Sequence, residues 1–166
     1  MQTPLKLVTA PHPVLRQKTK KIETFDESLR HFLDQMMVTM NQEHGLGLAA
    51  PQVGKSYHAF TMQMNNGQPY KMCNLEILKS SDERIAYKEG CLSFPGTFLE
   101  IERPRDVLVR YMDEFGKVIE QEFTDWESRC IQHELDHLNG TLFIDTLSKD
   151  RQDFIIRKIK KGKADI

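Results

Sequence analysis

The chain has 166 residues, a formal net charge of −1 at pH 7 and three cysteines. A chain of this length can bury a sizeable core, so we expect a single domain over residues 1–166. Its balanced charge does not favour DNA or membrane binding, and no apolar run reaches transmembrane length. The amino end lacks a hydrophobic signal core, and an odd number of cysteines argues against a disulfide scaffold. We therefore expect a cytoplasmic, reducing compartment.

The first part of the chain combines one helix pattern with several strand patterns. Apolar residues at helical spacing predict a helix over residues 26–43, with Asp26 or Thr24 as its N-cap. The Gly-rich stretch GLGLAAPQVG that follows is typical of a loop. Asn65-Asn66-Gly67 predicts a turn, and 113–116 predicts the turn of a hairpin. Strands are expected at 58–64, 70–78, 83–88, 97–102, 106–112 and 117–123.

Two helices are expected in the last quarter of the chain. One begins at Asp125 and ends near Asn139-Gly140, a pair typical of a helix C-terminus. The other covers about 149–161 and is locally basic. The order helix, strands, helices predicts an α+β fold in which mostly antiparallel sheets pack around the helix that starts at Asp125.

The most informative motif lies on that helix. His133, Glu134 and His137 form an HExxH pattern within QHELDHL. Residues four apart lie on one helix face, so the two imidazoles can converge on a single metal ion. Glu134 lies beside the first histidine, within reach of a water at the metal as its proton acceptor. The motif supplies two ligands and a base, and leaves the third ligand to be found.

The third ligand is expected upstream, because no His or Glu follows His137. Cys130 is on the correct helix face but lies about 10 Å along the axis from His137, too far to share one ion with it. Cys73 lies in an apolar strand pattern and is expected to be a small buried residue. We favour Cys91, which lies in the Gly- and Pro-bounded segment KEGCLSFPG and leaves a fourth position open for water. Asp145 is the alternative, in a small metallopeptidase.

Three segments together resemble the peptide deformylase family. They are GLGLAAPQVG, EGCLS and QHELDHLNG, in that family's order and at its approximate spacing. The similarity extends from HPVLR to LFIDTLS and so covers nearly the whole chain. One departure is Asn74-Leu75, where many members have Asn-Pro; the restored N–H can change strand pairing there.

The resemblance implies an activity and a set of residue roles. Members remove the formyl group from the N-terminal formylmethionine of new polypeptides and release formate. Cys91, His133 and His137 would bind the metal, and Glu134 would act as general base and acid. The side-chain amide of Gln52 and the backbone N–H of Leu92 would hold the formyl oxygen. The implied substrate-binding residues are Gly45, Leu46, Gly47, Tyr87, Glu89, Gly90, Trp126, Arg129 and Cys130.

The resemblance also implies cofactor and partners. Fe²⁺ is the expected ion, and Zn²⁺, Ni²⁺ or Co²⁺ also suit one thiolate and two imidazoles. The partners would be N-formylmethionyl nascent peptides. The basic C-terminal helix is expected to be a solvated surface helix; the alternative is that it docks on ribosomal RNA, as in some bacterial members of the family. A non-enzymatic domain that retains the metal or binds the ribosome is a third hypothesis. Glu134 and Gln52 argue against it, since holding the metal requires neither.

Overall fold

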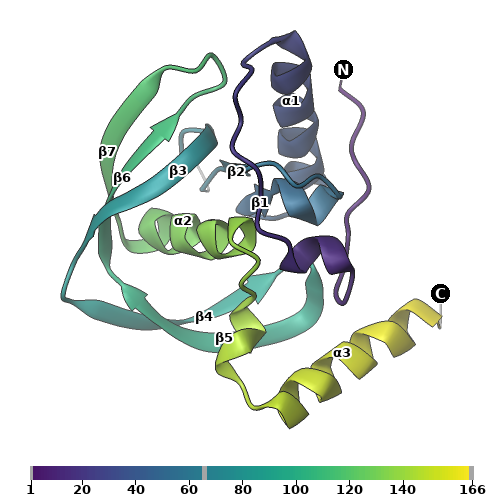
Figure 1. The fold of residues 1–166 in the computed structure, drawn as a ribbon. Helices are drawn as coiled ribbons and strands as arrows, with labels where there is room; N and C mark the ends of the chain where they lie inside the picture. The colour runs from purple at the N-terminus through teal and green to yellow at the C-terminus, as the bar shows by residue number, and fades with distance from the viewer. Residues whose placement is uncertain (1, 65–66, 165–166) are drawn as a thin grey trace.

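The computed structural model describes residues 2–64 and 67–164 and has the α+β architecture that the sequence predicts (Figure 1). Its helices are α1 (Glu27–Gln42), α2 (Asp125–Leu138) and α3 (Lys149–Ala164), with 3-10 helices η1 (Pro13–Arg16), η2 (Ala50–Val53) and η3 (Phe143–Thr146). Its strands are β1 (Gly47–Ala49), β2 (Ala59–Met62), β3 (Tyr70–Ser80), β4 (Arg84–Cys91), β5 (Phe94–Pro104), β6 (Asp106–Met112) and β7 (Val118–Thr124).

The strands form two sheets. Five strands pair in the order β1-β2-β3-β6-β7, and β4 and β5 form a separate hairpin; every pair of neighbours is antiparallel. Helix α2 runs between the larger sheet and the hairpin (Figure 1). Its apolar side packs Ile131 and Leu138 against Phe60 and Val109 of the larger sheet. The other side of α2 is thereby directed toward the hairpin.

Most sequence predictions of elements are confirmed. Helix α1 starts after Asp26, whose carboxylate accepts the N–H of Leu29 at 2.9 Å, so Asp26 rather than Thr24 is the N-cap. The 113–116 turn is present between β6 and β7, with Gly116 in the left-handed region. The prediction of a loop over GLGLAAPQVG is wrong for β1 and η2, which are too short to show a periodic pattern. The turn predicted at Asn65-Asn66-Gly67 involves residues outside the described part.

The Asn74-Leu75 departure coincides with an irregularity in β3. Asn74 has a positive φ of 53°, and the β3–β6 register shifts between Cys73 and Glu76. At this irregularity the Asn74 side chain pairs with the backbone of Ile22: its Oδ1 accepts from the Ile22 N–H and its Nδ2 donates to the Ile22 carbonyl, both at 2.8 Å. The amide thus attaches the segment before α1 to the sheet.

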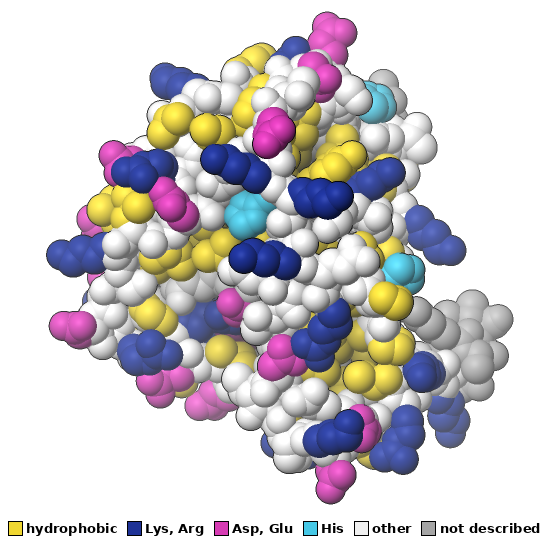
Figure 2. All heavy atoms as spheres, viewed as in Figure 1, with side chains coloured by type: hydrophobic (Ala, Val, Ile, Leu, Met, Phe, Trp, Pro, Cys, Tyr) yellow, Lys and Arg dark blue, Asp and Glu magenta, His cyan; other side chains and the backbone are white. Residues whose placement is uncertain are grey.

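Helix α3 lies against the hairpin side of the molecule (Figure 1). It buries Ile159 and partly buries Ile155 and Ile156 in a cluster with Phe94 and Phe143. Lys and Arg side chains protrude around it, at the lower right of Figure 2. It begins at Lys149 as expected and runs three residues past the predicted end at 161. None of the described helices has the length and apolarity needed to cross a membrane.

Candidate active site

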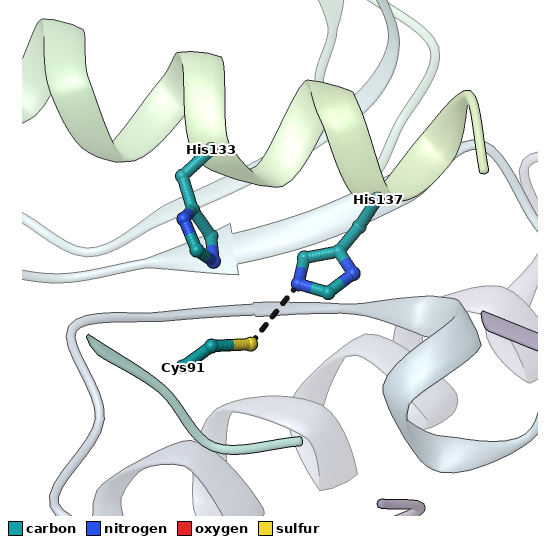
Figure 3. Close-up of side chains that lie close together, drawn as sticks. All are labelled: Cys91, His133 and His137. Atoms are coloured by element: carbon teal, nitrogen blue, oxygen red, sulfur yellow. Dashed lines mark hydrogen bonds between the residues drawn. The ribbon is translucent and has the colours of Figure 1, made fainter. Parts of the chain in front are cut away.

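Three side chains that are far apart in the sequence converge beside α2. Cys91 ends strand β4, and His133 and His137 point toward it from successive turns of α2 (Figure 3). One donor atom from each residue lies within 4.8 Å of the other two. The Cys91 Sγ and His137 Nε2 atoms are 3.2 Å apart. The HExxH histidines and the favoured cysteine therefore form one cluster.

The cluster fits a divalent metal by its chemistry. One sulfur and two imidazole nitrogens suit Zn²⁺, Fe²⁺, Co²⁺ or Ni²⁺, and three protein ligands leave a further position open. Glu134 Oε2 is buried without a hydrogen-bond partner in the described residues. An unpaired buried carboxylate oxygen beside a donor cluster is expected where a water molecule completes the site.

The other proposed ligands lie elsewhere. The Asp145 carboxylate accepts from Arg16 Nη1 at 2.8 Å and from the Leu142 N–H at 3.0 Å, so it is engaged at η3. Cys73 is buried in the cluster with Leu33 and Met36 of α1. Among the described residues, the convergent donor group includes neither Cys73 nor Cys130. The structure gives no support to the Asp145 alternative.

Glu89 fixes the orientation of the His133 ring on the side away from the cluster. The His133 Nδ1–H donates to Glu89 Oε1 at 2.9 Å, which leaves Nε2 to face the cluster. Arg103 binds the same carboxylate through two nitrogens at 2.6 and 3.0 Å, and Arg129 donates to it as well. Burial acts to raise the pKa of Glu89, but the hydrogen bonds from His133 and Arg103 lower it to about 2. The Glu89 carboxylate is thus engaged with protein groups, and Arg103 is a supporting residue that the sequence analysis missed.

Glu134 lies beside the metal ligands and against strand β1. Its Oε1 would be only 3.0 Å from a Cβ added at Gly47, so glycine there lets the strand approach the carboxylate closely. Burial raises the pKa of Glu134 to about 7. A carboxyl that titrates near neutrality can both accept and return a proton at physiological pH.

Gln52 on η2 faces the cluster from the other side. Its Oε1 accepts the Ala49 N–H at 2.9 Å, which fixes the orientation of the amide. The Nε2 group then lies 3.6 Å from Cys91 Sγ and 3.1 Å from Ser93 Oγ. Ser93 in turn donates to the Val8 carbonyl at 2.7 Å. The amide N–H₂ is therefore directed at the metal cluster as a neutral donor.

A cavity of about 690 Å³ opens beside the cluster. Of the residues that the sequence analysis assigned to the site, its lining includes Gly45, Leu46, Gly47, Gln52, Glu89, Gly90, Cys91, Leu92, Trp126, Arg129, Cys130, His133 and Glu134. Tyr87 is not part of the lining and instead packs its ring on Trp126 at 4.7 Å between centroids. The cavity also has walls that the sequence did not suggest: Leu7, Thr9, Lys88 and Phe98. They come from the N-terminal segment and from the hairpin.

Comparisons with known proteins agree on one family. Residues 4–153 match the family model described as polypeptide deformylase. Peptide deformylase of Bartonella henselae is 45% identical over 159 residues, covering 93% of this chain and 90% of the relative. That of Thermotoga neapolitana is 46% identical over 146 residues, 88% of each chain. The crystal structure of peptide deformylase from Ehrlichia chaffeensis in complex with actinonin has a TM-score of 0.94 at 40% identity, covering 97% of this chain and 98% of that one.

Proposed function

We propose residue roles from the premise that this chain belongs to the peptide deformylase family and removes the formyl group from N-formylmethionine at the start of new polypeptides. The observation that carries the proposal is the convergence of Cys91, His133 and His137 beside one cavity, whose lining includes Cys91, His133, Glu134 and Gln52. The reaction is hydrolysis of a formamide, which yields formate and a free methionyl amine.

Cys91, His133 and His137 would hold the divalent ion on which the family depends. When bound, such an ion polarises the formyl carbonyl and makes a water molecule more acidic. Glu89 keeps the His133 ring in the orientation that directs Nε2 to the cluster. We propose Fe²⁺ as the native ion. Metal content and activity after anaerobic purification, compared with the zinc-loaded protein, test that choice.

Glu134 is the proposed general base and acid. Its carboxylate accepts a proton as water attacks the formyl carbon, and it then gives this proton to the departing methionine nitrogen. The negative charge that develops on the formyl oxygen is stabilised by the Gln52 amide and the Leu92 backbone N–H. Gln52 is suited to this because the Ala49 N–H already holds its amide in the required orientation.

The substrate would enter the cavity as an extended chain. Gly47 would pair with its backbone. Gly45 and Gly90 would shape the cavity, because their lack of a side chain lets Leu92 and Phe98 pack over them. Leu46, Trp126, Arg129 and Cys130 would enclose the methionine side chain, with Tyr87 supporting Trp126 from behind. Arg129 also donates to the Ile101 carbonyl at 2.9 Å, which fixes its side chain in the wall.

Docking on the ribosome through α3 is a further part of the proposal. The support is the exposed basic side chains on this helix, among them Arg151, Lys158, Lys160 and Lys161. Charge reversal at these four positions should abolish salt-sensitive ribosome binding and leave hydrolysis of a free peptide intact. Equal ribosome binding by the reversed variant would contradict the docking.

We also propose that the enzyme works in the cytoplasm, where its free cysteines stay reduced.

The decisive test of the activity is formate release from formyl-Met-Ala-Ser. The protein is prepared anaerobically with Fe²⁺, beside a Glu134→Ala variant with the same metal content. We expect rapid release by the wild type and essentially none by the variant. Metal-loaded wild-type protein that released no formate would overturn the proposed function.

A further inference from the structure

We propose that Phe98 is a specificity-determining residue whose ring contacts the side chain of the substrate residue that follows formylmethionine. The contact favours aromatic and large aliphatic side chains at that second position. This inference rests on the proposed function, because it assigns a preference to the same site.

The position of Phe98 is fixed relative to the metal ligands. Phe98 on β5 pairs with Gly90 on β4, and Gly90 directly precedes Cys91. The ring lies over the glycine, so that a Cβ added at Gly90 would be 2.8 Å from Phe98 Cε1. Phe98 lines the cavity and yet remains 64% exposed. A large part of an aromatic ring is therefore available to a bound molecule.

Phe98 is part of an apolar rim. Four of the nine exposed large hydrophobic residues in the described chain gather at this cavity: Leu46, Phe98 and Trp126 in its lining, and Tyr87 packed on Trp126. Exposed apolar groups concentrated around one opening are typical of a ligand-binding surface. An apolar substrate side chain would cover area that is otherwise in water.

The second substrate residue can reach this rim. An extended chain advances about 3.5 Å per residue, so the second residue lies roughly 7 Å from the formyl group. Gly90 is one residue from Cys91, which puts the Phe98 ring at a comparable distance from the ligands. Side chains alternate in an extended chain, so with methionine enclosed by Leu46 and Trp126 the next side chain points away from them. Phe98 is the rim residue of the lining that does not enclose methionine, and its exposed ring is free to contact that side chain.

Two other roles for the rim give different results. Phe98 could serve only to cover Gly90, as aromatic residues do across strands; its loss would then lower stability without changing substrate preference. The charged Lys88 and Glu43 also line the cavity and could select by charge instead. A comparison of substrates that differ only at the second residue separates these roles.

The experiment measures kcat and KM for formyl-Met-Ala-Ser, formyl-Met-Phe-Ser and formyl-Met-Glu-Ser. Wild-type protein is compared with Phe98→Ala and Phe98→Leu. Phe154→Ala is the matched control, because Phe154 on α3 is 62% exposed and is not part of the cavity lining. We expect wild type to favour Phe over Ala by about fivefold to tenfold in kcat/KM, mostly through KM.

The variants give the decisive contrast. Phe98→Ala should reduce the Phe-over-Ala ratio to about two or less, Phe98→Leu should keep part of it, and Phe154→Ala should match wild type. Equal hydrolysis of the Phe and Ala peptides by wild type, or an unchanged ratio in Phe98→Ala, overturns the inference and leaves the proposed function standing. A preference that follows only the charge of the Glu peptide also overturns it. Hydrolysis of none of the peptides overturns the proposed function itself.

Discussion

Helices α2 and α3 are both amphipathic, but they bury different kinds of side chain. Helix α2 buries Arg129, Gln132, His133 and Glu134 beside its apolar residues, whereas α3 buries Ile159 and exposes its charged groups. Burial of polar groups costs free energy unless each finds a partner, and folding alone would not require it. The buried polar residues of α2 therefore indicate a functional site, whereas the buried apolar residues of α3 serve only to attach that helix to the rest of the domain.

The largest effect is expected at Glu134 of α2, the proposed general base and acid. Glu134→Gln keeps the shape of the side chain and removes its ability to accept a proton. We expect kcat to fall by about 10³ while thermal stability stays the same or rises, because a buried carboxyl without a full set of partners is removed. Formate release and calorimetry on metal-matched samples check this. A loss of stability as large as the loss of rate would remove the contrast between the helices.

The next largest effect is expected at Gln52, in the cavity wall that faces α2. Gln52→Leu retains much of the volume but loses the donor to the formyl oxygen. We expect kcat to fall by roughly 10² to 10³ with bound metal unchanged. Steady-state kinetics together with metal analysis provide the measurement. Gln152→Leu, on exposed α3, is the control and should leave kcat unaltered.

A smaller effect is expected behind the metal ligands. Glu89→Gln still offers an oxygen to His133 Nδ1 but removes the charge that Arg103 and Arg129 surround. We expect metal affinity to weaken about tenfold to hundredfold. Competition with a chelator measures it. Metal affinity equal to that of wild type would show that the charge of Glu89 is not needed to hold His133.

The smallest effect is expected on α3. Ile159→Val removes one buried methylene from the contact of α3 with the Phe143 cluster. We expect the free energy of unfolding to fall by about 1 kcal/mol, with no change in kcat on a free peptide. Chemical denaturation and kinetics at 25 °C test both parts. A change in kcat would show that α3 is coupled to the site.

The sequence predicts the parts of this site that obey a local spacing rule. The four-residue spacing of His133 and His137 is a property of one helix, and the axial rise along that helix argues against Cys130 as a ligand. Glu89 and Arg103 are 14 positions apart, on the paired strands β4 and β5, and their side chains meet only once the hairpin has folded, so no local pattern indicates the Arg103 contact. The orientation of Gln52 depends on the N–H of Ala49 and also on Ser93 Oγ, which is 41 positions away in the sequence. Contacts of this kind require the folded chain.

The fold, like the site, is predictable from the sequence where a local pattern exists. Periodic patterns predict α1, α2 and most strands, whereas β1 and η2 contain three and four residues and have no period to detect. The hairpin extends closer to its turn than predicted, because β4 runs to Cys91 and β5 begins at Phe94.

Strand β1 lies at the edge of the larger sheet and is only three residues long. A free sheet edge can pair with any extended chain, because the hydrogen bonds involve backbone atoms that all sequences share. An edge this short can hold only about three residues of a partner. An enzyme that acts on new polypeptides of different sequences benefits from such a short contact, since most of the substrate chain lies outside it and does not influence binding.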